Sequence, residues 1–146
     1  MSKADKAVET FKSGFNCSQA VLSVFCEELG LDKQAAARIA SGFGGGIGHL
    51  GKTCGAVTGA VMAISLKKGM SLPESISKSN QLVYDLVGQF AEKFIERNRS
   101  SECRDLLGMD IGDPEAYKEA RRQNLFYTVC TKYVHDAAEI AEEMIG

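Results

Sequence analysis

The chain has 146 residues, of which 45% are hydrophobic and 25% charged, and its formal net charge is -2. This size and composition predict one globular domain, residues 1–146, that is long enough to bury a core. The small net charge gives no electrostatic basis for binding nucleic acid or an anionic membrane. No apolar run approaches the roughly 20 residues of a membrane span, and the first residues form no apolar signal segment. We therefore expect a cytoplasmic protein without a nucleic-acid or membrane partner.

Helix signals dominate the first forty residues. Apolar positions in residues 4–13 recur at helical spacing. Asn16 can cap a second helix that runs to about residue 28, and Asp32 can cap a third over residues 33–40. These segments predict three short helices in succession.

A glycine-rich segment follows from Ser41 to Gly51, with six glycines in eleven residues, too many for a helix interior. Residues Gly46 to Thr53 match the phosphate-loop pattern Gly-x-x-x-x-Gly-Lys-Thr, but that motif requires a strand before it, and residues 38–42 are typical of a helix end. We therefore expect a loop rather than a nucleotide site. Free N–H groups at the following helix start favour any anion, including a thiolate, and the residue there is Cys54.

The helix over about 54–68 is apolar nearly all round, which is typical of a buried central helix. Small residues at Gly55, Gly59 and Ala63 allow a neighbouring helix to approach closely. A capping box at residues 71–74 starts a long helix to about residue 99. Asp113 can cap a further helix, and the last helix covers about residues 125–144. No alternating β-branched run indicates a strand. The pattern predicts an all-α bundle of about six to seven helices around the central helix.

Helical phase separates the five cysteines. Cys17 and Cys130 lie on the apolar stripes of their helices, where they are expected to be mid-helix and protonated. Cys54 opens the central helix, and Cys103 lies in a turn. Cys26 is nine residues after Cys17 and so faces the opposite side of the same helix. We expect the other four cysteines to converge, with Cys26 apart.

The cysteine spacing argues against several chemistries. There is no Cys-x-x-Cys pair, so neither a zinc knuckle nor a thioredoxin-type site is indicated. A protease-like Cys–His pair would need His49 or His135, and neither has a recognisable context. A single buried cysteine usually acts as a small hydrophobic residue, but four together favour chemistry.

The segment Cys54-Gly55-Ala56-Val57-Thr58-Gly59, with Cys17 before it and Cys103 and Cys130 after it, resembles the redox-active family named for its C…GCAxxG…C…C pattern. Family members are about this length. The resemblance implies a bacterial or archaeal redox protein, from a family whose related domains accompany electron-transfer cofactors. Cys26 lies outside the family pattern.

Four thiolates are the usual ligands of an iron–sulfur cluster, so Cys17, Cys54, Cys103 and Cys130 are the expected ligands of a [2Fe–2S] or [4Fe–4S] cluster used in electron transfer or redox sensing. The neighbouring cofactor-binding positions are expected at Gly51, Gly55 and Gly59. Cys54 is also the expected catalytic thiol, because a helix N-terminus and nearby Lys52 favour its thiolate.

Two alternatives remain open. The first is a metal-free thiol–disulfide oxidoreductase or redox sensor. The second is a structural helical protein that binds a partner, with cysteines incidental to its function. The redox partner protein is not identified by the sequence, and a homodimer remains an open alternative.

Overall fold

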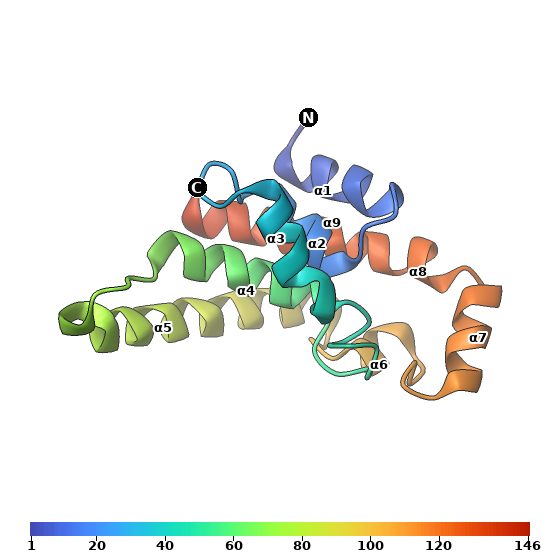
Figure 1. Cartoon of the computed structure of the whole chain (residues 1–146). Helices are drawn as coiled ribbons and strands as arrows, with labels where there is room; N and C mark the ends of the chain where they lie inside the picture. Colours follow the sequence, from blue (N-terminus) through green and yellow to red (C-terminus); the bar gives the residue numbers. More distant parts are fainter.

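The computed structural model describes all 146 residues. The fold is all-α, as expected (Figure 1). Its only β-type pairing is an isolated antiparallel bridge between Thr53 and Glu102. The elements in chain order are α1 (Lys3–Lys12), α2 (Cys17–Ser23), α3 (Lys33–Ala40), the 3-10 turn η1 (Ser41–Phe43), α4 (Gly55–Lys68), α5 (Pro73–Asn98), α6 (Cys103–Leu107), α7 (Pro114–Arg122), α8 (Leu125–Thr128) and α9 (Cys130–Ile145).

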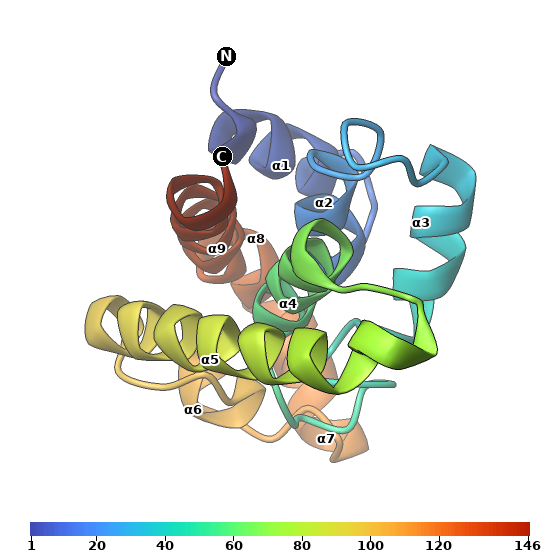
Figure 2. The ribbon, with the colours of Figure 1, turned by 90° about the vertical axis from the view of Figure 1, so that its left-hand side faces the viewer.

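Helix α4 is the centre of the fold. Figure 2 shows it surrounded by α2, α5 and α9, and it packs against all three. Gly59 lies so close to α2 that a Cβ there would be 2.6 Å from the carbonyl oxygen of Ser18. The expected close approach along the small residues of the central helix is therefore confirmed for α2.

The core is one cluster of 30 buried residues. Its largest fully buried side chains include Phe90 and Phe94 of α5, Ile64 of α4 and Ile140 of α9. Helix α5 extends beyond this core at the left of Figure 1, while α6, α7 and α8 lie towards the other end. No helix in the structure combines the length and the apolar character needed to cross a membrane.

Helix boundaries differ from the sequence expectation in three places. Helix α2 ends at Ser23 rather than at about residue 28, and residues 24–30 form turns. Gly30 has a left-handed φ of 83°, and Leu31 N–H donates to the Cys26 carbonyl at 2.8 Å. The turn around Cys103 forms the short helix α6. The last helix is broken at Val129, which separates α8 from α9.

The glycine-rich segment forms a loop with unusual backbone. Residues Gly45 to His49 all have left-handed φ values between 57° and 72°, and Ile47 is among them. Such values are rare for a β-branched residue. The loop is closed by hydrogen bonds, including Lys52 N–H to the Gly46 carbonyl at 2.8 Å. Since α3 precedes the segment and η1 forms its first three residues, it lacks the strand that a phosphate loop requires, as expected.

Candidate functional site

Four cysteines line one cavity of about 400 Å³. Each lies at the start of a different helix: Cys17 is the first residue of α2, Cys54 precedes α4, Cys103 begins α6, and Cys130 begins α9 after the break at Val129. The four cysteines predicted to converge therefore line one cavity, but no three of them form a site for a single metal ion. The expectation that Cys17 and Cys130 are mid-helix is wrong, because α2 begins at Cys17 and the last helix breaks before Cys130.

A short backbone pairing holds Cys54 beside Cys103. Cys54 N–H donates to the Ser101 carbonyl at 2.8 Å, and Cys103 N–H donates to the Lys52 carbonyl at 2.6 Å. Gly46 lies against this pair: a Cβ at that position would be 2.7 Å from the Cβ of Cys103. The glycine loop therefore fixes the position of Cys103, and a larger residue at Gly46 would displace it.

Cys130 lies beside Cys17 in the cavity. This neighbouring thiol is the main reason why the pKa of Cys17 is raised well above its ordinary value, and burial adds to the effect. Gly55 faces Cys17 closely, since a Cβ there would be 3.1 Å from the Cys17 Cβ. The two thiols are free in the structure.

Burial in the cavity also raises the pKa of Cys54 and of Cys103. Burial raises the pKa of Cys54 to about 12, and Cys17 adds to this, although the N–H groups of Ala56 and Val57 act in the opposite direction. The pKa of Cys103 is also raised to about 12, first by burial and then by Cys54 and Cys17. The expected lowering of the Cys54 pKa at a helix N-terminus is therefore not found, because removal from water outweighs the N–H groups.

The chain matches the model of the family described as "Putative redox-active protein (C_GCAxxG_C_C)" over residues 15–144. The chain belongs to this family. It is also similar to an uncharacterized protein of Archaeoglobus fulgidus, with 30% identity over 116 residues, which cover 73% of this chain and 77% of the relative. No solved structure matches the chain.

The four cysteines of the family pattern do not meet at one point. No group of three or more Cys, His, Asp or Glu side chains lies close enough together to hold a single metal ion. An iron–sulfur cluster contains several iron atoms, so its ligands are spread around it. Four thiols on the walls of one cavity match that donor set better than they match a single-ion site.

The remaining predicted residues divide into two groups. Gly55 lines the cavity with the cysteines, whereas Gly51 and Gly59 do not. Gly51 instead packs against Asp110, and Gly59 packs against α2, so these contacts give both glycines a structural role. Cys26 is fully buried outside the cavity, and its thiol donates to the Ser23 carbonyl at 3.4 Å. Its expected separation from the family cysteines is confirmed.

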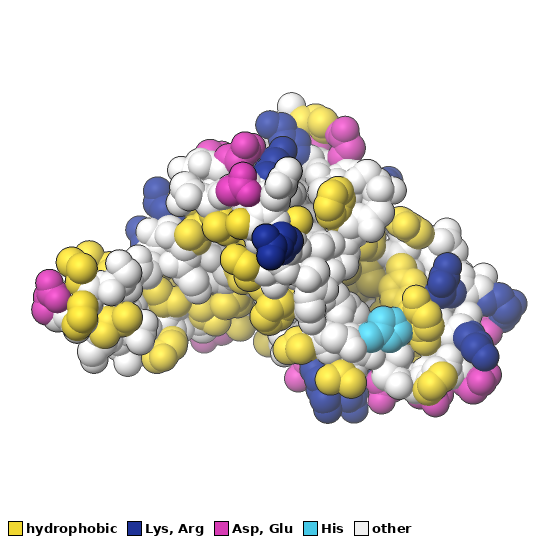
Figure 3. Space-filling model, viewed as in Figure 1, with side chains coloured by type: hydrophobic (Ala, Val, Ile, Leu, Met, Phe, Trp, Pro, Cys, Tyr) yellow, Lys and Arg dark blue, Asp and Glu magenta, His cyan; other side chains and the backbone are white.

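Sequence reasoning did not identify the aromatic part of the lining. The aromatic side chains on the cavity wall are Phe11, His49, Tyr117, Phe126, Tyr127 and Tyr133, and Arg121 accompanies them. The hydroxyl of Tyr133 donates to the Leu106 carbonyl at 2.9 Å, which ties α6 to α9. One feature of the sequence could have indicated part of this lining: Tyr117 and Arg121 are four residues apart in α7 and therefore share a helix face. In Figure 3 a recess with hydrophobic side chains opens on the right, beside a histidine.

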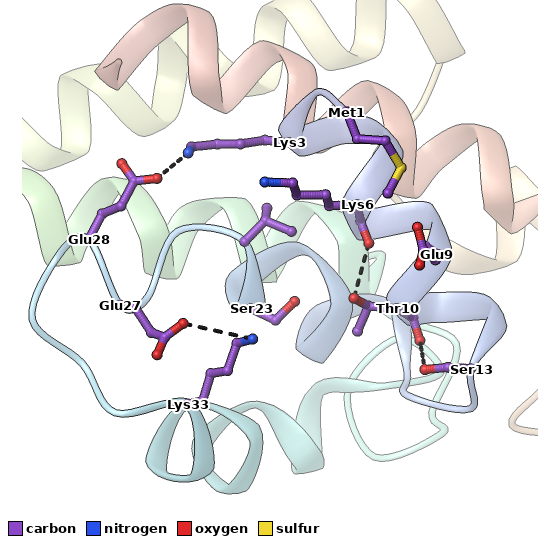
Figure 4. Close-up of a pocket in the computed structure, with 11 residues that line it drawn as sticks. Met1, Lys3, Lys6, Glu9, Thr10, Ser13, Ser23, Glu27, Glu28 and Lys33 are labelled. Carbon is purple, nitrogen blue, oxygen red and sulfur yellow. Dashed lines mark hydrogen bonds and ion pairs between the residues drawn. The ribbon is translucent and has the colours of Figure 1, made fainter.

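A second hollow, of about 440 Å³, lies between α1, the end of α2 and the start of α3 (Figure 4). Its wall consists mainly of lysine, glutamate and hydroxyl side chains. Lys3 pairs with Glu28, and Lys33 lies 3.7 Å from Glu27. Its opposite charges pair with one another, and no cysteine or aromatic ring lines it. Unlike the cysteine cavity, this polar hollow therefore offers no redox-active group.

Proposed function

We propose that the protein binds an iron–sulfur cluster through Cys17, Cys54, Cys103 and Cys130 and uses it for electron transfer or redox sensing. The observation that carries this proposal is the shared cavity: four thiols, each at the start of a different helix, line it, while the fifth cysteine is excluded. Cysteine has a strong tendency to be retained for its reactivity, and four thiolates form the common ligand set of such clusters.

The electrostatics of the cavity support a metal-centred role. Burial keeps the pKa of Cys54 and Cys103 near 12, so neither thiol forms much thiolate at neutral pH by itself. A metal reverses this balance, because it binds the deprotonated sulfur. When bound, the cluster would supply electron-transfer chemistry at a potential tuned by hydrogen bonds to sulfur. The N–H groups of Ala56 and Val57 already lie near the Cys54 sulfur.

Other residues would position the ligands. The backbone pairing at Thr53 and Glu102 holds Cys54 and Cys103 in register. Gly46 leaves room for Cys103, and Gly55 leaves room for Cys17, because a Cβ at either glycine would lie against the neighbouring cysteine. The pairing joins backbone atoms, and the two glycines bring their backbone close to the cysteine Cβ atoms, so the ligand positions would be fixed before the cluster is bound.

Thiol–disulfide chemistry is a second candidate, and the contact between Cys17 and Cys130 favours it. In this reaction a substrate disulfide would accept two electrons and two protons from the two thiols. One S–S bond would form between Cys17 and Cys130, and the substrate would leave as two thiols. Cys54 and Cys103 would then serve packing rather than chemistry.

Analysis of the protein purified and reconstituted without oxygen separates the two candidates. The cluster proposal predicts iron and acid-labile sulfide in near-equal amounts, together with visible absorbance, and the same result for Cys26→Ser. A colourless, iron-free product after reconstitution would contradict it. If mild oxidation of that product then removed two hydrogens in mass and linked Cys17 to Cys130 in a peptide map, the disulfide candidate would be supported.

A further inference from the structure

The cavity has a buried floor and a more open edge. On the floor, Cys54, Cys103 and Cys130 are only 6%, 8% and 7% exposed. At the edge, Tyr127 is 47% exposed, and the other ring side chains there are half-buried. We define the aromatic rim as the edge residues His49, Tyr117, Arg121, Phe126 and Tyr127.

The rings of the rim support one another across separate elements. His49, from the glycine loop, meets Tyr117 of α7 edge-on, with ring centroids 4.0 Å apart. Tyr117 in turn lies 5.8 Å from Phe126 of α8. Aromatic pairs at such distances stabilise each other and limit ring motion. The left-handed backbone of the loop at His49 therefore places a ring at the cavity edge.

One positive charge at the rim has no carboxylate partner. The guanidinium carbon of Arg121 lies 5.9 Å from the centre of the Tyr117 ring, and Arg121 makes no ion pair. The next residue differs, since Arg122 is paired with Glu119. An exposed, stacked guanidinium beside aromatic rings is suited to an anionic group on a planar ligand.

We propose that the aromatic rim binds a planar, electron-accepting ring that carries an anionic group, the chemistry shared by flavin nucleotides and acidic quinones. A cavity of about 400 Å³ is within the range that holds a ligand of this size. The rings offer stacking surfaces, and Arg121 offers the charge. The buried sulfurs are out of reach of a protein surface, but a small molecule in the cavity lies beside them. This site goes beyond cluster binding and requires no cluster.

Tyrosine fluorescence can report on the rim directly. The chain has no tryptophan, and three of its four tyrosines line the cavity. The exception, Tyr84, is exposed on α5 and can be replaced with phenylalanine to remove its background. Reduced, metal-free Tyr84→Phe protein is titrated in the dark with flavin mononucleotide, riboflavin and anthraquinone-2-sulfonate. We expect tyrosine emission to fall as each acidic ring binds, and the tighter of the two identifies the ligand source.

Matched variants test where binding occurs. Arg121→Gln should lower the affinity for the two acidic ligands by about threefold to fivefold and leave the affinity for riboflavin unchanged, in line with the loss of an exposed ion pair. The neighbouring Arg122→Gln should change none of the three affinities. Tyr117→Leu should lower all three affinities by about tenfold.

If neither acidic ligand changes the emission at millimolar concentration, or if Arg121→Gln and Arg122→Gln behave alike, the proposal is overturned. Circular dichroism checks the fold of each variant, and Phe126→Leu replaces Tyr117→Leu if the latter does not fold. Since all titrations use metal-free protein, the iron content of reconstituted protein remains an independent test of the proposed cluster.

Discussion

The cysteine cavity and the polar hollow have similar volumes, about 400 and 440 Å³, but are built from different parts of the chain. In the cysteine cavity, helix starts and glycine backbone hold the side chains. The polar hollow is surrounded mainly by long side chains whose charges pair at the surface. Lys33 and Glu27, for example, are both well exposed.

The difference teaches that volume alone does not indicate a site. Long exposed side chains lose entropy when they are held in one position, and their ion pairs are screened by water. Groups that must share a metal or exchange electrons need fixed positions. Around the cysteines the backbone provides such fixed positions. We therefore expect substitutions at closely packed backbone to change stability more than substitutions in the polar hollow.

At neutral pH, the largest effect on stability is expected where α2 meets α4. Gly59→Ala would place a Cβ 2.6 Å from the Ser18 carbonyl, so the two helices must separate, at a cost of about 1–3 kcal/mol of unfolding free energy. Gly88→Ala on α5 is the matched control, because a Cβ there meets nothing within 4 Å. It should stabilise the helix by about 0.5–1 kcal/mol. Urea unfolding measures both changes, and equal values would contradict the close packing of α2 on α4.

A separate effect, absent at neutral pH, is expected at high pH. The Cys54 thiol has a pKa of about 12 in the folded, metal-free protein and an ordinary value of 9.0. Between these pH values the Cys54 thiol is deprotonated in the unfolded state and still protonated in the folded state. The contribution of this thiol to the unfolding free energy is therefore fully present below pH 9 and is lost as the pH rises towards 12. The slope is at most about 1.4 kcal/mol per pH unit for this thiol. Urea midpoints of wild type and Cys54→Ser should diverge in this range; parallel curves would contradict the burial argument.

The smallest effect is expected in the polar hollow. Lys33→Gln and Glu27→Gln remove the two partners of an exposed ion pair at 3.7 Å. Each should change unfolding free energy by less than about 0.5 kcal/mol, and salt should reduce the difference further. Thermal unfolding at low and high salt checks this. A loss comparable to that of Gly59→Ala would mean that the polar hollow is as rigid as the cysteine cavity.

Much of this arrangement could be predicted from the sequence because it depends on local signals. Helical periodicity indicated the all-α fold, and the small residues at Gly55 and Gly59 indicated a close helix contact. Cys26 does lie apart from Cys17, but not for the predicted reason, because α2 ends at Ser23 and Cys26 follows it in a turn. The bridge between Thr53 and Glu102 could not be predicted, since it joins residues far apart in the chain. The high pKa of Cys54 was missed for the same reason: burial by distant elements outweighs the local helix start.

The central claim is that the four family cysteines act as one set, with Cys26 outside it. The direct test is to measure bound iron and sulfide in five single Cys→Ser variants, reconstituted without oxygen beside the wild type. We predict that serine at position 17, 54, 103 or 130 lowers retained iron at least about tenfold, by analogy with losses at metal sites. Cys26→Ser should keep the wild-type amount. If Cys26→Ser lost its iron with the rest, or if any one of the other four retained it fully, the account would be contradicted.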